Sequence, residues 1–247
     1  MSESRAAIVL AAGKGKRMKS DLPKVLHSIN DRPIIQILLD TLAKLNFERI
    51  VIVIGYKGEM VKQALTGYSV DFVWQTEQFG TGHAVEMARE ALADFSGTTL
   101  VALGDVPFLS ADSIEQLFLA HESTAAAATC LSAVLDDASG YGRIIRRGET
   151  DVLEAIVEEK DATDDQRAVN EINTGTFCFD NQILFDTLKG IDNRNAQGEY
   201  YLTDCIKILY DKGLRVSVKK LEDPNEGLGI NSAEQLEALA QHFTDRD

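Results

Sequence analysis

A strongly cationic segment follows the first apolar run of the chain. The run Ala6–Leu10 leads into residues 11–24, which contain two glycines and the five cations Lys14, Lys16, Arg17, Lys19 and Lys24. Glycine lets a backbone approach a ligand closely, and a loop at the end of a strand presents unpaired N–H groups to an anion. The only acid here is Asp21, although the 247-residue chain has a formal net charge of −14. The segment therefore predicts a phosphate site that would attract a nucleoside triphosphate.

Two common phosphate-binding motifs do not fit this segment. The dinucleotide fingerprint Gly-x-Gly-x-x-Gly needs a third glycine where the chain has Met18, and a P-loop needs four residues between its glycines. On this pattern alone, a surface turn with solvated lysines remains an alternative.

A second candidate residue, Asp105, ends the apolar run Leu100–Leu103 after Gly104. A carboxylate at the edge of a nucleotide cleft suits Mg²⁺, which takes few protein oxygens and keeps phosphate ligands. A helix or turn cap is the structural alternative. A glycosyltransferase with a paired Asp-x-Asp would have a second acid at Pro107, so that class is disfavoured.

The elements that must position these residues alternate between short β-branched runs and amphipathic stretches. This pattern predicts one α/β domain, Rossmann-like, with a mostly parallel mixed sheet flanked by helices. Ligands bind beyond the carboxyl ends of such strands, so the loops after Leu10 and Leu103 should border one cleft. Strands are predicted at 6–10, 50–54, 70–74 and 100–103, and helices at 34–45, 58–65, 82–92 and 111–121, the last capped by Ser110.

The second half of the chain has a different pattern. Residues 141–145 and 152–157 are predicted to pair as strands around Gly148, and 173–179 alternate as a half-buried strand. The acidic stretch 158–165 is expected to be a solvated loop, with Glu158 as the exception. A last helix is predicted over 232–243.

Composition excludes several classes of protein. A sequence pI near 4.7 argues against nucleic acid or an anionic membrane as partner. The three cysteines, Cys130, Cys178 and Cys205, are odd in number and far apart, which favours buried thiols over disulfides or a zinc site. No apolar run approaches a membrane span and no signal peptide pattern opens the chain, so we expect a cytoplasmic protein. The four histidines have no partners at the spacing of a triad or metal site.

The ordered pattern Leu-Ala-Ala-Gly-x-Gly-x-Arg-Met-x-Ser-Asp-x-Pro-Lys at residues 10–24 resembles the signature loop of the sugar-1-phosphate nucleotidyltransferases. Further segments make the chain similar to the uridyltransferase (pyrophosphorylase) domain of bacterial bifunctional N-acetylglucosamine-1-phosphate uridyltransferase/glucosamine-1-phosphate acetyltransferase, without the acetyltransferase domain. These segments are 75–84, 104–107, 140–143, 156–162, 171–175, 197–201 and 229–231, and the resemblance spans nearly the whole chain.

The resemblance implies roles for individual residues. Arg17, Lys24 and Asp105 would be catalytic, and Asp105 and Asn231 would hold Mg²⁺. Lys14, Lys16 and Lys19 would steer anions or be solvated. The nucleotide would be bound by Leu10, Ala11, Ala12, Gly13, Lys24, Gln75, Gly80, Thr81, Leu103, Gly104 and Asp105, and the sugar by Gly142, Glu158, Asn173 and Asn231.

The implied reaction is Mg²⁺-dependent transfer of uridylyl from UTP to N-acetylglucosamine 1-phosphate, by direct in-line attack at the α-phosphorus. Its product is a precursor of peptidoglycan and lipopolysaccharide. Residues 1–110 would bind the nucleotide and 111–231 the sugar. Another sugar 1-phosphate, such as glucose 1-phosphate, and a non-catalytic nucleotide-sugar sensor are the alternatives. Leu103 stands where the family commonly has Tyr, which could alter sugar selectivity. The oligomeric state is left open.

Overall fold

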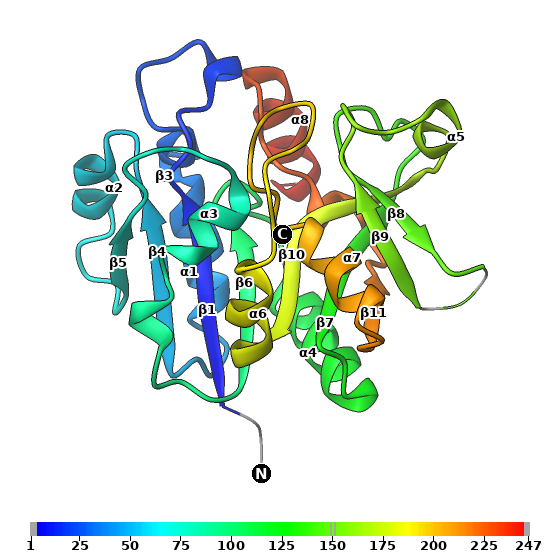
Figure 1. The fold of residues 1–247 in the computed structure, drawn as a ribbon. Helices are drawn as coiled ribbons and strands as arrows, with labels where there is room; N and C mark the ends of the chain where they lie inside the picture. Colours follow the sequence, from blue (N-terminus) through cyan, green and yellow to red (C-terminus); the bar gives the residue numbers. More distant parts are fainter. Residues whose placement is uncertain (1–3, 149, 151, 245–247) are drawn as a thin grey trace.

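The computed structural model describes residues 4–148, 150 and 152–244. Within these residues, one nine-stranded mixed sheet runs through the molecule, and a two-stranded hairpin lies outside it (Figure 1). The arrangement confirms the predicted α/β class. The strands are β1 Arg5–Ala11, β4 Arg49–Ile54, β5 Asp71–Trp74, β6 Thr98–Leu103, β7 Ala128–Val134, β8 Arg143–Arg146, β9 Leu153–Val157, β10 Glu171–Asp180 and β11 Val216–Lys220, with β2 Ser28–Ile29 and β3 Arg32–Pro33 forming the hairpin.

Helices cover both faces of the sheet (Figure 1). The α-helices are α1 Ile34–Leu42, α2 Gly58–Ala64, α3 Thr81–Glu86, α4 Ala111–Thr124, α5 Asp164–Arg167, α6 Asn181–Leu188, α7 Asp204–Asp211 and α8 Ala233–Thr244, and the short 3₁₀ turns are η1 Lys16–Met18, η2 Lys24–Leu26, η3 Glu90–Leu92 and η4 Pro224–Gly227. As predicted, Ser110 caps α4, because its hydroxyl accepts a hydrogen bond from the Ser113 N–H at 3.1 Å.

The central strand β1 shows why the sheet is buried on both sides. Ile8 packs into one core with α3, α6 and α7, while Val9 packs into a second core with α1, α2 and α4. Strands buried on both faces have nearly continuous apolar sequences, as β1 and β4 do. The hydrophobic effect from these two cores stabilises the platform that carries the site.

Strand β1 is parallel to both of its neighbours, β4 and β6. Leu10 is in register with Leu103, so the segments that follow β1 and β6 leave the same edge of the sheet side by side. The sequence prediction that these two loops adjoin is therefore confirmed.

The second half of the sheet is built differently. β10 lies antiparallel between β6 and β7, and β8 and β9 form the predicted antiparallel hairpin. The prediction of a half-buried strand at 173–179 was wrong for its last part. Residues 176–179 are all buried, because helices cover both faces of the sheet there.

The predicted helix 82–92 was also wrong in length. α3 ends at Glu86, and the following turns have hydrogen bonds between residues three apart, as in Arg89 N–H to Glu86 O at 3.1 Å. The Arg89 guanidinium also donates to the Phe185 carbonyl at 2.6 Å. The tertiary contact accompanies a tighter, 3₁₀-like path that ends in η3.

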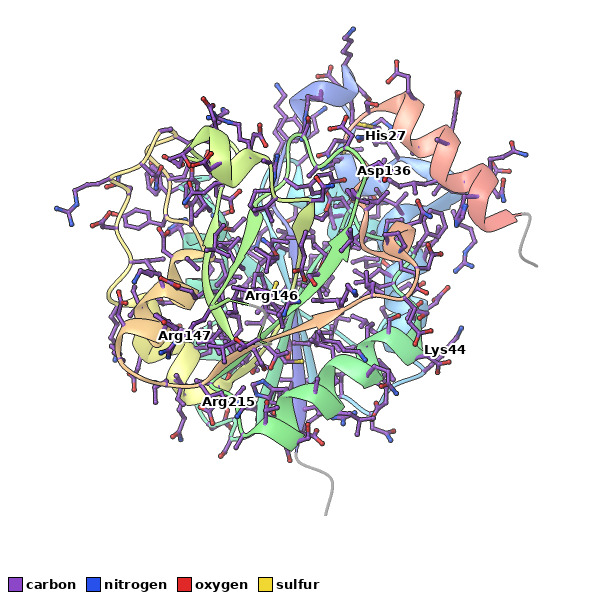
Figure 2. All side chains as sticks on the ribbon, turned by 90° about the vertical axis from the view of Figure 1, so that its right-hand side faces the viewer. His27, Lys44, Asp136, Arg146, Arg147 and Arg215 are labelled. Carbon is purple, nitrogen blue, oxygen red and sulfur yellow. The ribbon has the colours of Figure 1, made fainter. Side chains whose placement is uncertain are left out.

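The last helix, α8, lies beside the signature loop in both views (Figures 1 and 2). Met18 from the loop and Leu239 from α8 are buried in the same small apolar cluster as Ile230. This cluster joins two segments more than 200 residues apart in sequence. The cysteines Cys130, Cys178 and Cys205 are buried and free, as the sequence predicted.

Candidate active site

Two adjoining cavities lie at the carboxyl ends of β1 and β6. One, of about 420 Å³, is lined by the signature loop, including Gly13, Gly15 and Lys24. The other, of about 210 Å³, extends over β10 and the segments next to the β8–β9 hairpin, and includes Gly142, Glu158 and Asn173. We call them the cationic cavity and the polar cavity. Their common wall consists of Leu10, Arg17, Thr81, Leu103, Asp105 and Asn231.

The signature loop folds tightly around the stem of Lys24. Gly15 has φ +68°, and a Cβ there would lie 2.6 Å from the Cβ of Lys24, so glycine is needed for both conformation and space. Pro23 precedes η2 and brings the chain into that turn. The loop thereby directs the Lys24 ammonium group towards Asp105.

The two predicted metal ligands come together through a backbone contact. The Ile230 N–H group donates to the Asp105 carbonyl at 2.9 Å, which places the next residue, Asn231, beside the Asp105 carboxylate. On the other side of Asn231, its own N–H donates to Gln235 Oε1 at 2.8 Å, in the first turn of α8. The structure thus confirms that these two distant segments meet.

Both predicted phosphate-binding cations contact Asn231, and Lys24 also contacts Asp105. Lys24 Nζ forms an ion pair with Asp105 Oδ2 and donates to Asn231 Oδ1 at 2.6 Å. Arg17 Nη2 donates to the same Asn231 oxygen at 2.6 Å. The side chains of Lys24 and Asp105 are only 14% and 16% exposed, so this pair is screened less than a surface ion pair.

The donor set fits a magnesium ion. Asp105 Oδ2 and Asn231 Oδ1 both contact one nitrogen atom, so they lie close enough together to share a single cation. Mg²⁺ prefers oxygen ligands and is commonly held by one or two protein groups plus substrate phosphates. Among the described residues, no group of three or more His, Cys, Asp or Glu side chains forms a metal cage. Asp105 and Asn231 would hold such an ion together with a phosphate-bearing ligand.

Glu158 is the carboxylate of the polar cavity that lies away from the common wall. Thr203 Oγ1 donates to its Oε1 at 2.9 Å, and a Cβ on Gly142 would lie 3.5 Å from both carboxylate oxygens. Burial, assisted by Asp161 and Glu199, raises the pKa of Glu158, whereas the Thr203 hydrogen bond acts against this shift. The carboxylate is fixed and partly desolvated, as expected for a group that accepts hydrogen bonds from a ligand hydroxyl.

Asn173 is held by the backbone on two sides. Its N–H donates to the Gly142 carbonyl at 2.8 Å, and its Oδ1 accepts from the Gly175 N–H at 2.8 Å. The side-chain NH₂ is therefore the group left for a ligand in the cavity that Asn173 lines. Gly175, with φ +78°, has the Leu103 side chain directly over it, so Leu103 forms part of the apolar floor between the two cavities.

The predicted base-binding residues have different positions. Thr81 lines both cavities, whereas Gln75 and Gly80 line neither. Gln75 is 3% exposed and donates to the Gly80 carbonyl at 3.0 Å. Gly80 packs against the backbone of Tyr200, where a Cβ would lie 2.5 Å from the Tyr200 carbonyl oxygen. Gln75 and Gly80 therefore shape the loop beside the cavities, and their contact with a base stays a prediction.

The other predicted nucleotide-binding residues also include some that line a cavity and some that do not. Leu10, Ala11 and Gly13 line the cavities, while Ala12 and Gly104 do not. Ala12 is buried, and its carbonyl accepts from the Tyr56 N–H at 3.0 Å. The Gly104 N–H donates to the Leu10 carbonyl at 2.9 Å. Gly104 therefore joins the loop after β6 to the end of β1, and Ala12 joins the signature loop to the segment after β4.

Sequence reasoning missed two polar residues of the site, Tyr141 and Thr203. Tyr141 lines the polar cavity, and its hydroxyl is hydrogen-bonded to the Gly229 backbone. Burial raises the pKa of Tyr141, as does the nearby Asp105 carboxylate. Segment 140–143 contains Tyr141, and segment 197–201 ends two residues before Thr203, so these two motif segments were the available signal. The cavity is completed by Val106, Gly140, Thr174, Phe177, Leu202 and Gly229.

Comparisons with known proteins show what the chain is similar to. The model of the MobA-like NTP transferase domain matches residues 7–169. The chain is 48% identical over 228 residues to the bifunctional protein GlmU of Oceanobacillus iheyensis, covering 92% of this chain and 50% of that protein. It is also 48% identical over 229 residues to the bifunctional protein GlmU of Enterococcus faecalis, covering 93% and 50%. The chain thus spans about half the length of these curated relatives.

A solved structure supports the fold. The chain of a UDP-glucose pyrophosphorylase complexed with UDP-glucose superposes with a TM-score of 0.80 over 99% of this chain and 100% of that one, at 18% sequence identity. Of the helices in the described part of this chain, none is long and apolar enough to cross a membrane.

Proposed function

We propose, from the premise that this chain belongs to the family of MobA-like NTP transferase domains, that it transfers uridylyl from UTP to N-acetylglucosamine 1-phosphate. The products are UDP-N-acetylglucosamine and pyrophosphate. The observation that carries the proposal is the common wall of the two cavities, where Arg17, Asp105 and Asn231 lie between a cationic and a polar compartment. The relatives named bifunctional protein GlmU support the choice of reaction.

The charge distribution supports a sugar phosphate as the second substrate. Lys24 lines only the cationic cavity and Glu158 only the polar cavity, while Arg17 lies on their common wall. Asp161 and Asp204 are near enough to Glu158 to influence ionisation at the polar end. A phosphate is repelled from the acidic end and attracted to the cationic one. A sugar 1-phosphate therefore orients with its hydroxyls towards Glu158 and its phosphate towards the common wall.

The reaction needs no protein nucleophile. A phosphate oxygen of the sugar 1-phosphate forms the new bond to the α-phosphorus of UTP, and the bond from this phosphorus to the bridging oxygen of pyrophosphate breaks on the opposite side. The attacking group is already an anion at neutral pH, so no general base is required. Catalysis then depends on positioning and on stabilising charge on the phosphates.

Arg17 and Lys24 provide the mobile positive charge for this step. Both are long side chains that reach the common wall from the signature loop, so they can follow the phosphates as charge moves to the leaving group. Asp105 and Asn231 would hold Mg²⁺, which supplies charge neutralisation between the two polyanionic substrates. The Tyr141 hydrogen bond to Gly229 fixes the backbone next to Asn231.

The polar cavity supports the choice of an acetamido sugar. The Glu158 carboxylate can accept from a sugar hydroxyl, and the Asn173 NH₂ group can donate to an acetamido carbonyl. A site built to pair such groups rejects a ligand that lacks them. A hexose 1-phosphate without the acetamido group is the second candidate, and the UDP-glucose pyrophosphorylase with the same fold keeps it open. We place the reaction in the cytoplasm.

The test is release of pyrophosphate from UTP and Mg²⁺ with a panel of sugar 1-phosphates. We expect turnover with N-acetylglucosamine 1-phosphate to exceed that with glucose 1-phosphate and glucosamine 1-phosphate. A preference for glucose 1-phosphate would overturn the choice of sugar. If none of the sugar 1-phosphates is turned over, although calorimetry shows that the preparation still binds UDP-N-acetylglucosamine, the result would instead support a non-catalytic sensor.

A further inference from the structure

We infer that the Lys24 ammonium group is an internal counter-ion that occupies the metal ligands of the free protein, so that a divalent cation enters together with the nucleotide. The inference rests on the proposed function, because it concerns the same ligands. It goes further by stating which form of the substrate the site accepts: the nucleotide with its metal, rather than the metal first.

The contacts of Lys24 carry the inference. Its Nζ pairs with Asp105 Oδ2 and also donates to Asn231 Oδ1, the two oxygens that would coordinate the metal. Arg17 donates to the second of these oxygens as well. An ammonium group and a divalent cation cannot occupy the same pair of oxygens, since both the volume and the charge conflict.

The position of Lys24 is built into the loop. Gly15 lies beside the Cβ, Cγ and Cδ atoms of Lys24, so the loop holds the base of this side chain next to Asp105, and an exchange of partners involves its ammonium end. The pair with Asp105 is largely buried, which makes it costly to break unless each charge gains a new partner. Free Mg²⁺ offers a partner to Asp105 but none to Lys24.

A nucleoside triphosphate bound with its metal offers both partners. Its phosphates would enter the cationic cavity, which Lys24 itself lines, and could accept the ammonium group. The carboxylate of Asp105 would then be free for the cation. The exchange keeps every charge paired, and by linkage the nucleotide must raise the affinity for the metal as much as the metal raises that for the nucleotide.

The direct test is binding of Mn²⁺ alone to the free protein, measured by electron paramagnetic resonance. We expect Lys24→Met, which keeps the length of the side chain without its charge, to bind Mn²⁺ at least about tenfold more tightly than the wild type. Lys24→Gln should behave in the same way, and a thermal melt checks that both variants are folded. The double variant Lys24→Met/Asp105→Asn should not show this increase in affinity for Mn²⁺.

Lys14→Met is the matched control. Lys14 belongs to the same loop, but its ammonium group lies over the Tyr56 ring, 5.1 Å from the ring centroid. Removing this charge should change the affinity for Mn²⁺ less than about threefold. An equal gain in Lys14→Met would overturn the inference, since the effect would then be one of general charge.

Unchanged or weaker Mn²⁺ binding in folded Lys24→Met and Lys24→Gln would also overturn it. The readout needs neither UTP nor turnover, so it is independent of the test of function. If the tenfold gain is found but no sugar 1-phosphate is a substrate, the counter-ion stands and the proposed reaction fails.

Discussion

The two cavities differ in how their polar groups are held. In the cationic cavity, the side chains of Lys24, Arg17, Asp105 and Asn231 bind one another. In the polar cavity, Asn173 is held by backbone groups and Glu158 by the Thr203 hydroxyl beside the first turn of α7. One compartment holds an ion pair and hydrogen bonds between long side chains, which can be exchanged, and the other holds a fixed set of hydrogen bonds.

This difference matches what each ligand requires. Phosphates carry charge that shifts during the reaction, so long cationic side chains that can change partners are suited to them. A sugar is neutral over its ring and is recognised by the directions of its hydroxyl and amide groups, for which preset donors and acceptors are better. The common wall is where the cationic cavity, with its exchangeable contacts, meets the polar cavity, with its fixed hydrogen bonds.

The largest effect is expected from Asp105→Ala, which removes the carboxylate on the common wall. The maximal rate of pyrophosphate release should fall at least about 1000-fold, because the charge that would hold the metal is lost. The free energy of unfolding should also fall, because the largely buried Lys24 ammonium group loses its ionic partner, so a thermal melt must show that the variant is folded under the assay conditions.

Asp21→Ala provides the control for Asp105→Ala. It removes one exposed carboxylate from the same loop region and should leave the rate within about threefold. Turnover by Asp105→Ala at more than a tenth of the wild-type rate would remove this residue from the metal site.

The smaller effect on the polar side is expected from Glu158→Gln. The variant keeps the size of the side chain but replaces a charged acceptor, and hydrogen bonds to charged groups contribute about 1.5 to 3 kcal/mol. The KM for the sugar 1-phosphate should therefore rise about tenfold or more, while the KM for UTP stays within about twofold. Steady-state kinetics with each substrate varied in turn measures both.

Asp165→Asn, on the exposed side of α5, is the charge-matched control for Glu158→Gln and should change neither constant. An equal rise of both KM values in Glu158→Gln would break the comparison, because the two cavities would then not bind separate ligands.

The sequence could predict the cationic side better than the polar side. The signature loop is contiguous, so Gly15, Arg17 and Lys24 were found from one segment, and the parallel order of β1 and β6 follows from hydrophobic pattern. The meeting of Asp105 with Asn231 depended on the family resemblance, since no local pattern brings residue 231 to residue 105. In the structure, the hydrogen bond from the Ile230 N–H group to the Asp105 carbonyl brings Asn231 beside Asp105.

The polar side depends on tertiary packing, which local pattern does not determine. Thr203 acts on Glu158 only because α7 packs beside β9, and Tyr141 acts only because it reaches the Gly229 backbone. The contact of Gln75 and Gly80 with the base stays a prediction, and the contacts that the structure shows for these two residues include each other, His83 and Tyr200. Spacing in the sequence could not distinguish a residue that lines a cavity from one that supports its wall.

The smallest effect concerns the acid that adjoins the polar side, Asp204. Burial raises its pKa to about 6, assisted by Asp192, Glu158 and Asp161, from an unfolded value near 3.8. Between pH 4 and 6 the folded state therefore binds more protons than the unfolded state, so this group's contribution to stability is lost as the pH rises through 6. Above that pH the ionised carboxylate destabilises the fold.

Asp204→Asn should remove this penalty. Because Asp204 is partly exposed and lies in the first turn of α7, where a negative charge is favoured, we discount the full shift and expect a gain of about 1 kcal/mol at pH 8. The gain should shrink towards zero at pH 4, since the wild-type acid is then protonated in the fold. Urea unfolding of both proteins at the two pH values measures this difference, and His121, whose pKa is lowered to about 4, is common to both and cancels. A gain that is equal at both pH values would show that the acid carries no desolvation penalty, and the polar side would then differ from the cationic side in geometry alone.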